Sequence, residues 1–224
     1  MRAAFPASDA PTPRGTGLVY LALIGAGLAG NYFKFPIFLN VEFLFGSIFV
    51  LLALQLFGPV RAVLAALLIT SITWWIWSHP YAIVIVTAEV GVAALLMRRL
   101  RISLVLAVSA YWLLLGMPLV YLFYHQVMHL SADIALVTMI KQAVNGITNA
   151  LLARLIYIGY SLYSRQALVT LREMLHNAFV LAVLAPMLFL LAYDSGKDLK
   201  NAQELARVNL GQESERLGAQ LDIW

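Results

Sequence analysis

Long apolar runs, broken by short polar segments, dominate the pattern of this chain. A helix that crosses a bilayer needs about 20 mostly apolar residues, because each residue adds a rise of about 1.5 Å. Seven stretches approach or reach that length: Gly17–Phe33, Phe43–Gly58, Arg61–Ser78, Tyr81–Met97, Ser103–Phe123, Ile134–Tyr160 and Asn177–Tyr193. Prolines 59 and 80 lie in two of the tight gaps, where they end one helix and start the next. The pattern predicts an all-α membrane protein with seven transmembrane helices.

Composition excludes the other broad classes. With 62% apolar and 12% charged residues, the chain is neither an ordinary soluble globule nor disordered. The net charge of +4 comes from residues spread between apolar runs, whereas nucleic-acid binding needs them gathered on one face. Cysteine is absent, which excludes disulfides and thiolate metal sites.

Lysine and arginine positions set the expected orientation, because short cytoplasmic loops are enriched in them. With the N-terminus in the cytoplasm, the outer loops before the last crossing hold only Lys34. The inner loops and helix ends then hold Arg2, Arg14, Arg61, Arg98, Arg99, Arg101, Arg154, Arg165 and Arg172. We therefore expect a multi-pass protein of a bacterial inner membrane. Cleavage of the first helix as a signal peptide is the alternative, and it would leave the other six crossings in place.

The same pattern divides the chain into segments. Residues 1–16 predict a disordered cytoplasmic leader, 17–160 a six-helix membrane domain, 161–176 a cytoplasmic connector and 177–193 the seventh helix. Residues 194–224 predict an exported amphipathic helix whose apolar stripe needs a partner. That stripe stops in mid-pattern at Trp224, which favours the start of a longer extracytoplasmic domain; a helix that lies free or dimerises is the alternative.

Two ionisable residues fall well inside predicted spans. Glu89 and Lys141 lie at similar depth in helices that both run inward, which predicts an ion pair. Such a pair either fixes packing or lines a ligand pocket, and the absence of a pair is the third option. A polar stripe lies beside Lys141, formed by Thr138, Gln142, Asn145, Thr148 and Asn149. It predicts either hydrogen bonds between helices or a hydrated, ligand-filled cavity.

Aromatic and hydrogen-bonding residues crowd the expected outer ends of the helices, as in a membrane-interface belt or a small-molecule pocket. They are Asn31, Tyr32, Phe33, Phe35, Asn40, Glu42, Trp74, Trp75, Trp77, His79, Tyr111, Trp112, Tyr121, Tyr124, His125 and Gln126. His125 and His129 share a helical spacing but lack a third metal ligand, so no metal site and no cofactor is predicted. No catalytic motif is present, and we do not expect this chain to be an enzyme.

Two short segments carry a family resemblance. The runs Phe35-Pro36-Ile37 through Glu42-Phe43-Leu44-Phe45-Gly46, and Phe57-Gly58-Pro59-Val60-Arg61-Ala62-Val63, resemble the substrate-binding S components of energy-coupling-factor vitamin transporters. Those proteins have six helices, an extracellular loop after the first helix, a Gly-Pro turn between helices two and three, and a polar sixth helix. The resemblance covers Gly17–Tyr160, the S-component-like part of the chain.

The chain departs from S components after Tyr160, where a connector, a seventh helix and an exported helix follow. This layout is similar to the vitamin-uptake-like membrane sensor domains of bacterial histidine kinases and cyclic-di-GMP enzymes. The resemblance implies a ligand site on the outer side of the membrane. The residues it nominates are Asn40, Glu42, Trp77, Glu89, Tyr121, Lys141, Gln142 and Asn145.

The expected function is sensory input to a bacterial signalling receptor, in which a small ligand biases the seventh helix. The alternatives are a transporter S component and a membrane anchor with a vestigial pocket. The expected partners are the lipid bilayer and an unidentified small molecule, with a homodimer left open and no nucleic acid.

Overall fold

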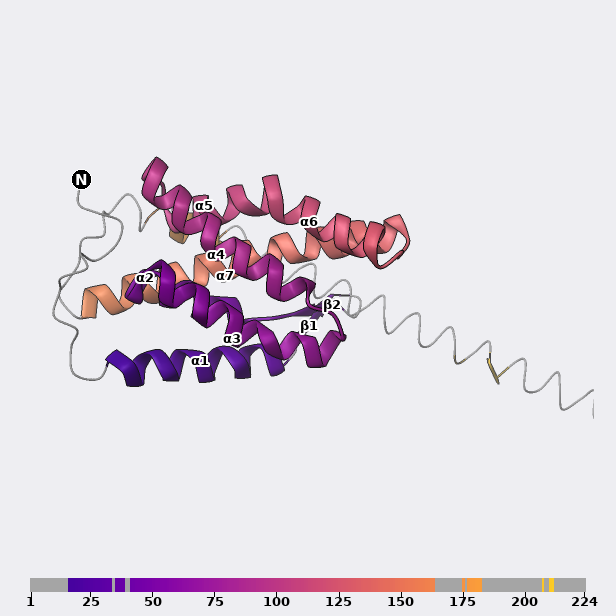
Figure 1. Ribbon diagram of the computed structural model, residues 1–224, viewed down its shortest axis with the longest axis horizontal. Coiled ribbons are helices and arrows are strands. Elements are labelled where there is room, and N and C mark those ends of the chain that lie inside the picture. The colour runs from indigo at the N-terminus through magenta and orange to yellow at the C-terminus, as the bar shows by residue number, and fades with distance from the viewer. Residues whose placement is uncertain are drawn as a thin grey trace, which may run out of the picture. The chain divides into compact units, whose positions relative to one another are not determined.

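The computed structural model describes residues 16–33, 35–38, 41–163, 175, 177–182, 207 and 210–211. The chain divides into two compact units, one formed by Met1–Phe35 and Phe43–Leu181, the other by Pro36–Glu42 and Ala182–Trp224. The described part of the first unit is a helical bundle (Figure 1). Most of the leader, of the connector, of the exported helix and of the seventh helix lies outside the described residues.

The described chain is almost entirely helical, and the six helices expected up to Tyr160 are present. Their boundaries are α1 Thr16–Tyr32, α2 Gly46–Phe57, α3 Pro59–Trp77, α4 Tyr81–Leu100 and α7 Ala132–Tyr163, with the fifth expected helix continuous from Leu104 to Val127. This fifth helix consists of α5 Leu104–Tyr111, the π-helical η1 Trp112–Gly116, α6 Met117–Tyr121 and the π-helical η2 Leu122–Val127.

The largest difference from the predicted pattern lies before α2. A helix was expected from Phe43, but Val41–Phe43 forms a short strand, β2, that pairs with β1, Phe35–Phe38. Both strands are only three or four residues long, and periodicity over such short runs does not distinguish a strand from the end of a helix. As a result α2 has only 12 residues, about 18 Å of helix.

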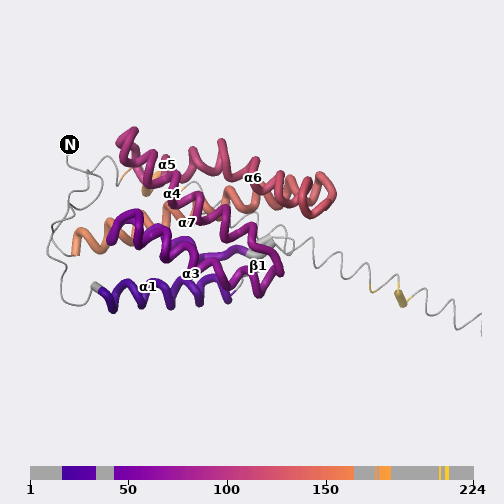
Figure 2. Tube along the Cα trace, in the orientation of Figure 1, coloured from indigo at the N-terminus to yellow at the C-terminus, as the bar shows by residue number. Residues whose placement is uncertain are grey.

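Tight turns join the helices. Gly58 alone connects α2 to α3, with φ of 83° and ψ of 178°, and Pro59 opens α3. A positive φ at this position favours glycine, and proline suits the first helical turn because its missing N–H has no partner there in any case. Ser78, with φ of 57°, ends α3, and Ser103 caps α5 by accepting from the Leu106 N–H. These turns make successive helices run back and forth (Figure 2).

Helix α2 lies at the centre of the packing, in contact with α1, α3 and α7, while α4 packs on α3 and α5. The core is mostly aliphatic, with Leu51, Leu54, Ile69 and Val90 almost fully buried, and its largest buried side chains are the aromatic Tyr111 and Trp112. Because the helices alternate in direction, the C-terminus of α1 and the N-terminus of α2 lie at the same end of the bundle. We call this the pocket end, and the opposite end the arginine end, because Arg61, Arg98, Arg99 and Arg101 lie there.

Large apolar side chains also cover the outside of the bundle. Leu18, Trp75 and Leu114 are 75%, 88% and 73% exposed, and similar residues lie on every long helix. Within the described chain, three helices are long and apolar enough to cross a membrane: Pro59–Trp77, Tyr81–Leu100 and Leu104–Val127. Helices α1 and α2 are apolar but shorter. Helix α7 is long, but it carries the polar stripe and is not among the three.

Candidate functional site: a polar pocket at one end of the bundle

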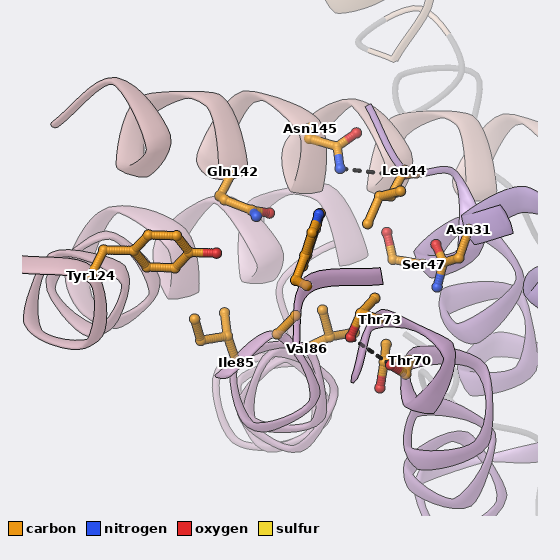
Figure 3. A pocket seen from close by; sticks show the side chains of 12 residues that line it. Asn31, Leu44, Ser47, Thr70, Thr73, Ile85, Val86, Tyr124, Gln142 and Asn145 are labelled. Atoms are coloured by element: carbon orange, nitrogen blue, oxygen red, sulfur yellow. Dashed lines mark hydrogen bonds between the residues drawn. The ribbon is translucent and has the colours of Figure 1, made fainter. Parts of the chain in front are cut away.

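Six helical segments converge on a pocket at the pocket end (Figure 3). The space open to the centres of water molecules is about 30 Å³, enough for one or two waters. We call this space the polar pocket. Its lining residues are Asn31, Leu44, Ser47, Thr70, Thr73, Trp77, Ala82, Ile85, Val86, Tyr124, Gln142 and Asn145.

Asn31 ties three helices together at one wall of the pocket. Its Nδ2 donates to the Ile69 carbonyl on α3 at 3.1 Å, and its Oδ1 accepts from the Gly46 N–H at the start of α2 at 2.9 Å. A Cβ at Gly46 would overlap the Asn31 amide, so this close approach needs glycine. Asn31 is 3% exposed and both ends of its amide are used, which makes it a structural part of the wall.

The polar stripe of α7 forms a second wall by bonding to the start of α2. Asn145 Nδ2 and Asn149 Nδ2 both donate to the Leu44 carbonyl, at 3.1 and 2.8 Å, and Asn149 also donates to Ser47 Oγ at 2.6 Å. The stripe therefore does act as a hydrogen-bonded contact between helices, one of the two predicted options. It also lines the pocket, through Gln142 and Asn145. Asn145 Oδ1 is buried without a hydrogen-bond partner.

Packed aromatic side chains form the third wall, of which Trp77 and Tyr124 line the pocket directly. We define the aromatic wall as Trp77, His79, Tyr81, Phe123 and Tyr124. The His79 ring stacks on both Trp77 and Tyr81, with centroids 5.9 and 5.1 Å apart. The Tyr124 hydroxyl lies 3.5 Å from His79 Nε2, and Tyr81 stacks on Phe123 at 4.6 Å. Burial lowers the pKa of His79 below its ordinary value of 6.5, and its Nδ1 is buried without a hydrogen-bond partner.

Below the pocket, Glu89 has a different partner from the one expected. Its Oε1 accepts a hydrogen bond from the indole nitrogen of Trp112 at 3.1 Å, and the side chain is 1% exposed. Among the contacts given for the described residues, Glu89 is bonded to Trp112 and not to Lys141, which is half buried on α7 and has an interaction of its own. The reason is that Trp112 lies against Gly146 of α7, where a Cβ would overlap the indole. Glu89 thus meets the indole and not an α7 side chain.

The structure brings together part of the predicted site. Trp77, Gln142 and Asn145 line the pocket, whereas Glu89, Tyr121 and Lys141 do not. The Tyr121 ring lies instead against His125, with centroids 5.0 Å apart. Asn40 and the side chain of Glu42 lie outside the described residues.

Five polar lining residues were not nominated as ligand-binding: Asn31, Ser47, Thr70, Thr73 and Tyr124. Asn31 and Tyr124 belong to the polar and aromatic set at the outer helix ends. Thr70, Thr73 and Trp77 follow helical spacing on one face of α3, a pattern that could have identified both threonines. Ser47 carries no such pattern in the sequence.

The histidine pair has a structural explanation. His125 Nδ1 donates to the Leu130 carbonyl at 2.8 Å, which stabilises the turn before α7. His129 lies beyond η2 with φ of 56°, so the two rings do not share a helical face. Within the described ranges, no group of three His, Cys, Asp or Glu residues is placed to hold a metal ion.

No protein-family model, curated protein or solved structure matches this chain.

Proposed function

We propose that the chain is the membrane-embedded input module of a bacterial signalling receptor. In this proposal it crosses the inner membrane seven times, with its N-terminus in the cytoplasm. It binds a small ligand from the outer side in the polar pocket. The resulting change passes along α7 to the expected seventh transmembrane helix, Asn177–Tyr193, and from there to a kinase or a cyclic-di-GMP enzyme. The observation that carries the proposal is the polar pocket, which lies opposite the arginine end and is walled by the long helix α7.

The distribution of side chains supports a membrane location. Large apolar residues such as Leu18, Trp75 and Leu114 face outward, an arrangement that is costly in water and stable in lipid. The exposed Arg61, Arg98, Arg99 and Arg101 gather at one end, as expected for a cytoplasmic face. The pocket end then faces outward, so that a solute outside the cell reaches it first.

Helix α7 supports a role in transmission. Gln142 and Asn145 line the pocket from this helix, and its 32 residues extend about 48 Å, to Tyr163. Near its other end, Arg154 donates to Gln55 Oε1 of α2 at 2.9 Å. A ligand that prefers one position of α7 therefore changes contacts at the arginine end as well.

The pocket size sets a requirement for this mechanism. About 30 Å³ holds water but no aromatic ring, which needs a cavity of about 150 Å³. A ligand of that size has to displace pocket walls, and this displacement gives the unequal binding of two conformations that a sensor needs.

The test uses native mass spectrometry on the full chain extracted with native lipids. It compares the wild type with two variants in which leucine replaces an alanine. Ala82 lines the pocket, so Ala82→Leu fills it, whereas Ala132→Leu places the same bulk at an exposed position at the start of α7. We expect a discrete bound molecule in the wild type and in Ala132→Leu, and its loss in Ala82→Leu. A wild type without a bound molecule, and without a response to any added compound, favours the membrane anchor.

The transporter alternative is separated from the receptor by what the bound molecule does. ATP-dependent uptake of that molecule by cells that express the chain supports an S component. A kinase or cyclase domain encoded in the same reading frame, with activity that changes with the ligand, supports the receptor.

A further inference from the structure

Among the residues that the structure describes, the lining of the polar pocket contains no charged side chain. Its polar members are amides, hydroxyls and the aromatic groups Trp77 and Tyr124. Glu89 lies below the pocket and is bonded to Trp112, and Lys141 is not a lining residue. A charged ligand would lose its hydration in this space without gaining an opposite charge, which is strongly unfavourable.

Most polar groups of the lining are already used within the protein. Thr70 and Thr73 donate their hydroxyl hydrogens to carbonyl groups of their own helix, and Asn31 uses both ends of its amide. Ser47 accepts from α7. Two lining amides keep free hydrogen-bonding capacity: Asn145 Oδ1 is buried without a partner, and the half-buried amide of Gln142 makes no hydrogen bond to any described residue. The Gln142 amide extends into the same space as the Tyr124 hydroxyl (Figure 3). A primary amide offers two donors and one acceptor in one plane.

We infer that the polar pocket selects an uncharged, planar ligand with an amide-like edge, recognised by the side-chain amide of Gln142 alongside the rings of Trp77 and Tyr124. This inference rests on the proposed function, since it names the class of ligand for the same pocket. An amide edge pairs its own donor and acceptor with those of Gln142, and a flat ring suits contact with aromatic walls. A ring enters only if Trp77 or Tyr124 moves, because the present space is about 30 Å³.

The test uses three probes of nearly the same shape and different charge: benzamide, benzoate and benzamidinium. Binding to the full chain in lipid nanodiscs is measured by saturation-transfer NMR at millimolar probe concentrations, as suits fragments of this size. In the wild type we expect benzamide to bind at least about tenfold more tightly than either ion.

Two substitutions at Gln142 then test the recognition itself. Gln142→Met removes the amide at similar volume without breaking an internal hydrogen bond, so we expect benzamide to weaken about tenfold while the fold is kept. Gln142→Glu introduces a carboxylate, and we expect the preference to change from benzamide to benzamidinium. Thr138→Val is the matched control, one turn away on α7 and outside the lining, and it should leave all three affinities unchanged.

Ala82→Leu, which fills the pocket, defines the background from probe dissolved in lipid. Benzoate or benzamidinium binding the wild type as tightly as benzamide, with both signals lost in Ala82→Leu, would overturn the inference and leave the proposed function standing. Benzamide binding that is the same in wild type and Ala82→Leu would also overturn it. Discovery of a natural ligand in the pocket by native mass spectrometry would still support the proposed function in that case.

Discussion

Trp112 and Glu89 form a buried hydrogen-bonded pair, in which the indole nitrogen donates to the carboxylate across 3.1 Å. The two side chains are 2% and 1% exposed, and Trp112 also lies against Gly146. Through this pair α4 contacts the junction of α5 and η1, and through Gly146 the junction contacts α7. Glu89 lies one turn along α4 from Ile85, which lines the pocket. Helix α4 therefore connects the pocket lining to the buried Glu89–Trp112 pair.

Substitution of Glu89 tests what the carboxylate contributes. Glu89→Gln keeps an oxygen that accepts from Trp112, and we expect a free energy of unfolding equal to or above that of the wild type. Glu89→Leu leaves the indole N–H without an acceptor, and we expect a loss of about 1–3 kcal/mol. Both are measured by chemical unfolding in detergent micelles. Equal destabilisation by the two variants would show that the negative charge itself is needed.

Gly146 tests the close approach of α7 to Trp112. A methyl group there overlaps the indole, and we expect Gly146→Ala to destabilise the protein by about 1–3 kcal/mol. Gly91 on α4 has open space around its Cβ position, so Gly91→Ala is the matched control and should be neutral or slightly stabilising. Thermal unfolding of both variants provides the comparison, and equal melting temperatures would contradict this packing.

The two asparagines of α7 should differ in their effect on stability. Asn149→Leu removes hydrogen bonds to the Leu44 carbonyl and to Ser47, at about 0.6–2 kcal/mol each in a membrane. Asn145→Leu removes one bond, and the Leu44 carbonyl keeps its bond from Asn149. We therefore expect a larger drop in melting temperature for Asn149→Leu. The reverse order would show that Asn145 is the main link between α7 and α2.

The buried His79 ring predicts a pH dependence of stability. Its pKa is lowered by burial, so the folded protein favours the neutral ring and the unfolded chain binds a proton more readily. The stability from this residue is therefore fully present above the unfolded pKa of about 6.5 and is lost as the pH falls from there through the lower folded pKa. Melting temperatures should fall as the pH drops below about 6.5, and His79→Phe, which keeps the ring stack, should reduce this slope. An unchanged slope in His79→Phe would assign the effect to other groups.

The chain contains no cysteine, which makes movement of α7 directly measurable. Leu100 and Tyr163, at the ends of α4 and α7, are 62% and 91% exposed and accept spin labels after substitution by cysteine. If α7 transmits ligand binding, the distance between the labels should change when the molecule identified by native mass spectrometry, or benzamide, is added. Ala82→Leu should abolish the change. A distance that is the same with and without ligand excludes this part of α7 as the transmitting element.

Helix positions could be predicted because hydrophobic runs and their breaks are local features of the sequence. Gly58-Pro59 and Ser78-His79-Pro80 mark turns by their backbone chemistry, and α3 and α4 begin or end within a few residues of them. The strand pair Phe35–Phe38 and Val41–Phe43 could not be predicted in the same way, because strand pairing depends on a partner segment.

The pocket was predicted in part for a related reason. Gln142 and Asn145 stand out in the sequence as polar residues inside an apolar run, and both line the pocket. Glu89 stands out equally, but its burial is explained by Trp112, a partner that no spacing rule connects with it. Depth along a helix can be read from the sequence, whereas the direction in which a side chain points depends on how the helices pack.

The shortness of α2 has a consequence for the depth of the polar pocket. Helices α2 and α3 start from the same turn at Gly58, and α3 is longer by seven residues, the difference between 19 and 12. The N-terminus of α2 therefore stops about 10 Å below the far end of α3. Under the proposed membrane location, Leu44 and Ser47 of the polar pocket then lie nearer the middle of the bilayer than the far end of α3 does.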